Sequence, residues 1–218
     1  MKQSYAAFLF DVDGTLISSI ASAERVWTRW ALSHGVDVAA FLPTIHGVRS
    51  IDTIRSVGLP GIDVEAEAAR IERAEIADTE GIVEIPGAAA FVSSLPPDRW
   101  AIVTSASLEL AKRRLGAAGM KLPRVMITAE DVTVGKPDPQ GYRLAARRLG
   151  VEAADCLVFE DAPAGIGAGR AAGADVLVIT ATHGAPAAAH PFSVADYRGL
   201  RAASTAEGRL RLEGLRAL

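Results

Sequence analysis

Two acidic residues end an apolar run near the start of the chain. The stretch FLFDVDGTL, residues 8–16, places Asp11 and Asp13 directly after residues with the pattern of a buried strand. A second acidic pair, Glu160 and Asp161, ends a similar run in LVFED. Side chains at the carboxyl ends of parallel strands face the crevice in which open α/β sheets bind ligands. These residues are therefore candidates for metal binding and for nucleophilic or acid–base chemistry.

Electrostatics favours a cation between the two acidic pairs. Two carboxylates about 4 Å apart repel by roughly 4 kcal/mol at an effective dielectric constant near 20, so a dry cluster of acids cannot stay ionised unaided. A divalent cation relieves the repulsion, and oxygen ligands without a cysteine cluster select Mg²⁺ over zinc, since Cys156 is the only cysteine. A turn at Asp13 or a helix cap at Asp161 explains either pair alone, but not both.

Three further polar residues follow other apolar runs. Thr104 and Ser105 end WAIVTS, where a hydroxyl can cap the next helix or bind an anionic oxygen. Lys136 stands between Gly135 and Pro137 in GKPDP, and this restricts its backbone more than a solvent-facing lysine requires. Beside a cation, the Lys136 ammonium would complete a pocket suited to a phosphoryl group.

Five apolar runs predict the strands that position these residues. They are short and rich in β-formers, and they span residues 6–10, 100–105, 124–129, 156–161 and 175–180. Helical patterns alternate with the later runs, over residues 108–118, 140–149 and 164–172. The alternation predicts an α/β fold with a doubly wound, mainly parallel sheet. The alternating RLRLE, residues 209–213, indicates a last edge strand or tail.

The segment between the first two runs is helical in pattern. No strand run occurs from about Leu16 to Ile85, whereas residues 21–33 and 64–78 are amphipathic with a helical period. A crossover connection needs only about a dozen residues or somewhat more, so this long interval predicts an inserted helical subdomain. We divide the chain into an α/β core, residues 1–15 and 87–218, and a helical cap, residues 16–86.

Composition argues against several classes of partner. The chain of 218 residues has a formal net charge of −3 and a sequence pI near 5.8, so it offers no cationic surface for nucleic acid or anionic lipid. The N-terminal apolar run is too short for a signal peptide, and no segment approaches about 18 uninterrupted apolar residues. We expect a cytoplasmic monomer that acts on a small molecule.

The order of the motifs resembles the haloacid dehalogenase superfamily, and specifically its phosphatases with a helical cap after the first motif. The motifs are DVDGTL, Thr104 in IVTS, Lys136 in GKPDP, and FEDAPAGIGAGRAAG, and the resemblance extends to about residue 180. The segments IHGVRSID, TEGI and IPGA are similar to the sugar-phosphatase and 2-deoxyglucose-6-phosphatase branch. The resemblance implies that the predicted strands lie in the order fifth, fourth, first, second, third.

The resemblance also implies catalytic roles. Asp11 would attack phosphorus and form an aspartyl-phosphate, and Asp13 would protonate the leaving alcohol and then deprotonate water. Thr104 and the Ser105 backbone would hold phosphoryl oxygens while Lys136 neutralises the transition state and orients the nucleophile.

A magnesium site is implied in the same way. Mg²⁺ would be held by the Asp11 carboxylate, the backbone carbonyl of Asp13 and the Asp161 carboxylate, with Glu160 acting through water. This set matches the acidic pairs that electrostatics had already singled out.

Substrate choice is expected to depend on the cap. His46 and Arg49 in HGVR, and Glu80 in TEG, are polar residues in segments expected to border the closed site. Arg49 could pair with a hydroxyl or a second phosphate of a sugar. The alternative is that all three are ordinary surface residues of the cap.

The function expected from the sequence is a Mg²⁺-dependent phosphatase of small phosphorylated sugars or polyols that works through an aspartyl-phosphate. A β-phosphoglucomutase-like phosphotransferase is the nearest alternative, but that enzyme's cap relies on lysine and histidine, whereas this chain has no lysine between residues 3 and 111 and offers Ser18 and Ser19 after the first motif. A non-catalytic phospho-accepting or binding protein on the same scaffold is the alternative from another class.

Overall fold

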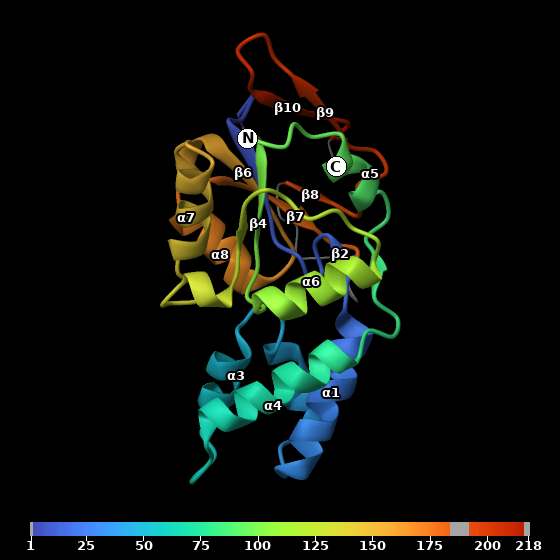
Figure 1. Ribbon diagram of the computed structural model, residues 1–218, viewed down its shortest axis with the longest axis vertical. Helices are drawn as coiled ribbons and strands as arrows, with labels where there is room; N and C mark the ends of the chain where they lie inside the picture. The colour runs from blue at the N-terminus through green and yellow to red at the C-terminus, as the bar shows by residue number, and fades with distance from the viewer. Residues whose placement is uncertain (1, 184–191, 216–218) are drawn as a thin grey trace.

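A computed structural model describes residues 2–183 and 192–215, and it has an α/β part and a helical part stacked along the longest axis (Figure 1). The central sheet contains β1 (Ala7–Phe10), β4 (Trp100–Val103), β5 (Met126–Ile127), β6 (Cys156–Glu160), β7 (Asp175–Ile179) and β8 (Ser193–Val194). The order is β5-β4-β1-β6-β7-β8, and all neighbouring strands are parallel. The strand order that the resemblance implied is confirmed. Strand β8 was not predicted, because two residues show no apolar run.

Helices cover both faces of this sheet, which makes it doubly wound. The α/β part contains α5 (Ala88–Ser93), α6 (Leu108–Ala117), α7 (Gln140–Arg148) and α8 (Pro163–Ala171), with short 3₁₀ turns at Ala129–Asp131 and Ala153–Asp155. Because side chains alternate along a strand, Phe8 and Phe10 pack into one core cluster with α5, whereas Ala7 and Leu9 pack into a second with α7 and α8. The three predicted helices of this part are confirmed to within one residue at each end.

The helical part packs around a core of its own. It contains α1 (Ile20–Ser33), α2 (Val38–Phe41), a 3₁₀ turn (Leu42–Thr44), α3 (Ser50–Val57) and α4 (Val64–Ala77). Trp27 and Trp30 are buried there with Phe41, Ile54 and Ile71, in a cluster separate from those of the sheet. This separate core supports the proposed division into a core, residues 1–15 and 87–218, and a cap, residues 16–86.

Two short strands join the parts and correct one expectation. Strand β2 (Ile17–Ser18) pairs antiparallel with β3 (Val83–Glu84), so the expectation of no strand between Leu16 and Ile85 was wrong. The two chain crossings between the parts run side by side there, and the Ile85 N–H donates to the Leu16 carbonyl at 2.9 Å. A pair of two-residue strands is too short to give a periodic signal.

The C-terminal region forms a hairpin at the end of the molecule away from the cap. Strands β9 (Arg201–Ser204) and β10 (Leu210–Glu213) pair antiparallel, so the strand expected over residues 209–213 is present as β10 (Figure 1). Tyr5 and Leu210 exchange two backbone hydrogen bonds of 2.8 Å, which attach the hairpin to the start of the sheet. Within the described residues, no helix has the length and apolar character needed to cross a membrane.

Candidate active site

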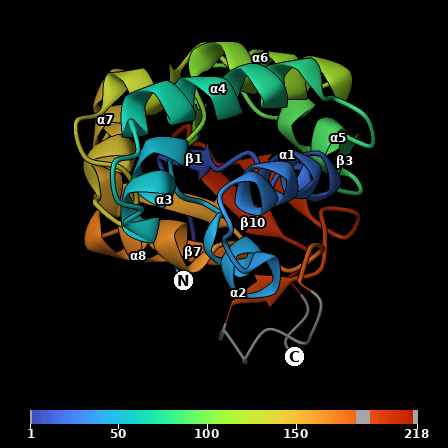
Figure 2. The same cartoon turned by 90° about the horizontal axis from the view of Figure 1, so that it is seen from below.

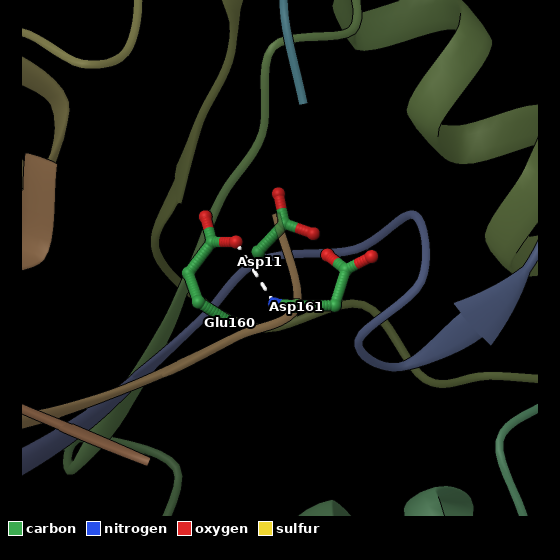
Figure 3. Close-up of side chains that lie close together, drawn as sticks. All are labelled: Asp11, Glu160 and Asp161. Atoms are coloured by element: carbon green, nitrogen blue, oxygen red, sulfur yellow. Dashed lines mark hydrogen bonds between the residues drawn. The ribbon is translucent and has the colours of Figure 1, made fainter. Parts of the chain in front are cut away.

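Three of the four acids in the two pairs meet at the carboxyl end of the sheet. Strands β1 and β6 are neighbours with Phe10 opposite Phe159, so Asp11 and Glu160 follow at the same edge. Asp11, Glu160 and Asp161 are buried, and each offers a carboxylate oxygen within 4.8 Å of the others (Figure 3). The convergence predicted from two segments about 150 residues apart in the chain is therefore present.

Lys136 lies between two of these acids. Its Nζ atom donates to Oδ1 of Asp11 and to Oε1 of Glu160, both at 2.6 Å, and all three side chains are almost fully buried. The hydroxyl of Tyr142, in α7, donates to the same oxygen of Glu160 at 2.8 Å. Sequence reasoning missed Tyr142 because an aromatic residue on a predicted helix has the signature of ordinary core.

Glu160 fixes the loop that carries Asp161. Its second oxygen, Oε2, accepts hydrogen bonds from the backbone N–H groups of Asp161 and Ala162 at 3.0 and 3.3 Å. Gly165, in α8, makes room for this carboxylate, because a Cβ atom there would lie 1.6 Å from Oε1. Both oxygens of Glu160 are thus engaged by the protein, as expected for a residue that acts on a metal only indirectly.

Burial and mutual repulsion shift the protonation of the acids. Burial, with repulsion from Glu160 and Asp13, raises the pKa of Asp11 to about 7 although Lys136 opposes the shift. Burial and the charges of Asp11 and Glu160 likewise raise the pKa of Asp161 well above its ordinary value. Burial alone would lower the pKa of the Lys136 ammonium, but the carboxylates of Asp11 and Glu160 outweigh it and raise that pKa. The protein alone supplies too little positive charge for this cluster.

The donor set fits a hard divalent cation. Three carboxylates converge and no sulfur atom lies among them, and the raised pKa values of Asp11 and Asp161 show that their ionised forms are disfavoured without added positive charge. Oxygen ligands of this kind suit Mg²⁺ or a similar ion rather than zinc. Both oxygens of Glu160 are held by Lys136, Tyr142 and the loop backbone, so Asp11 and Asp161 are the better candidates for direct coordination. Thr15 Oγ1 donates to Oδ1 of Asp161 at 3.3 Å and orients it.

Asp13 lies apart from the metal cluster and faces the cap. Its Oδ1 atom accepts from the Ser19 hydroxyl at 2.5 Å and from Nη1 of Arg114 at 3.0 Å. Arg114, in α6, also donates through Nη2 to Oε1 of Glu75 in α4 at 3.0 Å. Sequence reasoning missed Arg114 and Glu75, because charged residues on amphipathic helices are usually solvent-exposed.

Thr104 and Ser105 stand where β4 gives way to the loop before α6. The Thr104 hydroxyl accepts from the backbone N–H of Ala106 at 3.1 Å, and the Ser105 hydroxyl donates to the backbone carbonyl of Gly47 in the cap at 3.0 Å. Both residues line the same cavity as Asp11. Their contacts with phosphoryl oxygens stay a prediction.

A cavity of about 480 Å³ lies between the cap and the sheet. It brings together the predicted residues Asp11, Asp13, Thr104, Ser105, Asp161 and His46. Its wall also contains residues that were not predicted as site residues: Ser19, Glu24, Trp27, Glu75, Arg114 and His183. His183 is hydrogen-bonded through Nε2 to the backbone carbonyl of Asp161 at 2.9 Å, so it helps to shape the loop that carries Asp161.

The three cap residues expected to bind substrate are divided by the structure. His46 lines the cavity, and burial lowers its pKa. Arg49 is not part of this wall: its Nε donates to Asp52 at 2.6 Å, and its Nη1 reaches the Thr133 carbonyl at 3.4 Å, which joins cap to core. Glu80 is exposed outside the cavity, and its backbone carbonyl accepts a hydrogen bond from Arg25 at 2.8 Å.

Comparison with known proteins agrees with this arrangement. A family model described as haloacid dehalogenase-like hydrolase matches residues 5–173. Hexitol phosphatase A of Escherichia coli (strain K12) is 44% identical over 183 residues, 82% of this chain and 85% of the relative. 2-Deoxyglucose-6-phosphate phosphatase 1 of Saccharomyces cerevisiae is 35% identical over 80% of each chain. The crystal structure of a hydrolase from Pseudomonas syringae superposes with a TM-score of 0.74 at 26% identity, covering 84% of this chain and 87% of that one.

Proposed function

The chain belongs to the haloacid dehalogenase-like hydrolases, and from this premise we propose that it is a Mg²⁺-dependent phosphatase of small phosphorylated sugars or polyols. The observation that carries the proposal is the contact of 2.6 Å between Lys136 Nζ and Asp11 Oδ1 inside a cluster of three buried carboxylates. This places a nucleophilic carboxylate beside a fixed positive charge at the mouth of a cavity.

The first step is attack by Asp11 on the phosphorus atom. The bond between Asp11 and phosphorus forms as the bond to the leaving alcohol oxygen breaks, and Asp13 gives its proton to that oxygen. Thr104 and the Ser105 backbone bind phosphoryl oxygens, and Lys136 holds the Asp11 carboxylate in place while it neutralises charge that develops on phosphorus. In the second step Asp13 takes a proton from water, which attacks the aspartyl-phosphate and restores Asp11.

Mg²⁺ would be held by Asp11, Asp161 and the backbone carbonyl of Asp13, with Glu160 acting indirectly. When bound, the ion supplies the positive charge that offsets repulsion between the carboxylates and the dianionic phosphoryl group. Support comes from the oxygen donors within 4.8 Å of one another and from the raised pKa values of Asp11 and Asp161.

The cavity supports a small, hydroxyl-rich substrate with a single phosphate. Its volume of about 480 Å³ is ample for a six-carbon chain, and Glu24, His46 and Glu75 provide groups that can hydrogen-bond to hydroxyls. Arg114 is the only lysine or arginine among the described lining residues, and its two terminal nitrogens are already bonded to Asp13 and Glu75. A second phosphate or a carboxylate on the substrate would therefore meet acids without a free cation.

The named activities of the two curated relatives, a hexitol phosphatase and a 2-deoxyglucose-6-phosphate phosphatase, agree with this substrate class. The phosphotransferase and non-catalytic alternatives are not favoured, since both relatives are named as phosphatases. The negative net charge further supports a protein that acts without nucleic acid or membrane partners, and we propose that it works as a monomer in the cytoplasm.

A phosphatase assay over a broad panel of phosphorylated metabolites tests the proposal. We expect phosphate release to require Mg²⁺, to stop with EDTA, and to rank sugar and polyol monophosphates first by kcat/KM. Asp11→Asn should abolish turnover because it removes the nucleophile. Turnover that survives in Asp11→Asn, or a panel without any substrate, would refute the proposed function.

A further inference from the structure

A buried chain of charges connects the α/β part to the cap beside the catalytic cavity. Arg114 in α6 contacts Asp13 through Nη1 and Glu75 in α4 through Nη2, each at 3.0 Å. The Arg114 and Glu75 side chains are both only 6% exposed. Helix α4 lies alongside α6 in both views, so this pair sits where cap and core touch (Figure 2). All three residues line the cavity.

Packing alone does not account for these charges. Removing an arginine and a glutamate from water is costly, and apolar side chains of similar volume often stabilise a fold as well or better than a buried ion pair does. The Nε atom of Arg114 is in addition buried without a hydrogen-bond partner in the part of the chain that the structure describes, which adds to the cost. A charged bridge at this cost indicates a role at the site that the bridge adjoins.

The contacts of Asp13 indicate what that role is. The Arg114 guanidinium and the Ser19 hydroxyl both donate to Oδ1, so Oδ2 has no hydrogen-bond partner among the described residues. A carboxyl group fixed through one oxygen can present the other to a reacting atom. The planar fork of Arg114 sets this orientation from one side, while its other nitrogen is anchored on Glu75 of the cap.

We propose that Arg114 is a positioning residue that orients the Asp13 carboxyl group for proton transfer, and that Glu75 supplies its anchor when α4 lies against α6. This inference rests on the proposed function, in which Asp13 protonates the leaving alcohol. It links closure of the cap to assembly of the proton donor: the guanidinium has both of its partners only when the two parts meet.

The test compares leaving groups. An alkyl alcohol needs a proton as it departs, whereas p-nitrophenolate is stable as an anion and does not. The quantity to compare is kcat/KM, because it includes only the steps up to transfer of the phosphoryl group to Asp11 and excludes the later hydrolysis that both substrates share. The two substrates are the best sugar or polyol phosphate of the panel and p-nitrophenyl phosphate, each with saturating Mg²⁺.

Two variants make the test robust to loss of folding. R114K keeps the charge but loses the two-pronged fork, and R114M/E75Q removes the pair without leaving either charge buried alone. R113M is the matched control, since Arg113 is the neighbouring residue of α6 and is exposed. Circular dichroism and thermal unfolding report whether each variant is folded.

We expect both variants to lose about 100-fold in kcat/KM for the alkyl phosphate and to stay within about threefold of wild type for p-nitrophenyl phosphate. R113M should match wild type on both substrates. Equal losses on the two substrates in a folded variant would show a purely structural contact and overturn the inference, as would an unchanged kcat/KM on both. A wild-type protein that hydrolyses neither substrate would instead refute the proposed phosphatase function.

Discussion

Lys136 Nζ lies 2.6 Å from Asp11 Oδ1, although 125 residues separate the two in the chain. The contact depends on the parallel pairing of β1 with β4 and β6, which brings the loop after β5 back over the end of β1. Among the described residues, the Lys136 ammonium is the only cation bonded to the acidic cluster, in which burial and mutual repulsion raise the pKa values of Asp11 and Asp161. It both steadies the nucleophile and partly offsets the charge around it.

We expect Lys136→Met to lower kcat by roughly 100- to 1,000-fold, the usual cost of losing one charge-stabilising donor in a transition state. The substitution also leaves Asp11 and Glu160 without their shared cation, so the midpoint of thermal unfolding should fall. Lys112→Met, on an exposed position of α6, is the control for loss of a lysine. A kcat within a few-fold of wild type would show that Lys136 is not needed.

Metal binding should stabilise the protein more strongly at pH 8 than at pH 5. Burial raises the pKa of Asp11 from 3.8 to about 7, so between these values the native state holds a proton that the unfolded state has released. The free energy of unfolding of the metal-free protein should therefore fall as pH rises through this window. Mg²⁺ binds the ionised form, so it must displace the proton at pH 5 but not at pH 8.

Thermal unfolding with Mg²⁺ or EDTA at the two pH values measures this difference. Asp161→Asn is the control, because it removes one proposed ligand and should abolish most of the Mg²⁺ effect at both pH values. An equal Mg²⁺-induced shift at pH 5 and pH 8 would contradict competition between protons and metal at this site.

Two of the three buried tyrosines of the α/β part, Tyr142 and Tyr197, can be compared to measure what the hydrogen bond to Glu160 contributes to stability. The Tyr142 hydroxyl donates to Glu160 at 2.8 Å, whereas the Tyr197 hydroxyl is buried without a partner among residues 2–183 and 192–215. Tyr142→Phe should reduce the free energy of unfolding by about 1.5–3 kcal/mol, as expected for a hydrogen bond to a charged group. Tyr197→Phe should be neutral or slightly stabilising. Urea unfolding of both variants checks this, and equal effects would contradict a specific role of Tyr142.

The sheet and the polar residues at its carboxyl edge could be predicted because their signals are local and distinct. Runs such as residues 156–161 are continuous in apolar character, and each ends in the polar residues that the edge of a parallel sheet brings together. Strands β2, β3 and β8 could not be found this way, since each has only two residues and is defined by its pairing with a neighbouring strand.

The part of the site that borders the cap was harder to predict. Arg114 and Glu75 lie on amphipathic helices, and nothing in a single sequence distinguishes a buried charge from a solvated one before the partner helix is known. For Arg49 and Glu80 the sequence suggested a binding role because both are polar residues of the cap. In the structure Arg49 joins cap to core and Glu80 faces solvent.

Substrates with a second anionic group should be poor. Arg114 is the only arginine or lysine among the described residues that line the cavity, and it is already paired with Asp13 and Glu75. A hexose bisphosphate should therefore have a kcat/KM at least about tenfold below that of the matching monophosphate. This ratio corresponds to about 1.4 kcal/mol of lost transition-state stabilisation. Glu75→Gln is expected to reduce this difference in kcat/KM between the monophosphate and the bisphosphate. Equal kcat/KM values would show that a free cation reaches the substrate.

Gly165 and Gly167 lie two residues apart on α8 and should respond oppositely to alanine. A Cβ atom at Gly165 would lie 1.6 Å from Glu160 Oε1, whereas one at Gly167 would lie 3.4 Å from the Pro137 Cβ, an ordinary contact. Gly165→Ala must therefore displace Glu160 from Lys136, Tyr142 and the loop backbone. We expect it to lower both the unfolding midpoint and the affinity for Mg²⁺.

Gly167→Ala should instead keep full activity and gain up to about 1 kcal/mol, because alanine favours a helix over glycine. Thermal unfolding, together with a Mg²⁺ titration followed by phosphate release, measures both variants. If Gly165→Ala bound Mg²⁺ as tightly as Gly167→Ala, the position of Glu160 would not set the position of the loop that carries Asp161. The indirect role assigned to the Glu160 carboxylate would then be wrong.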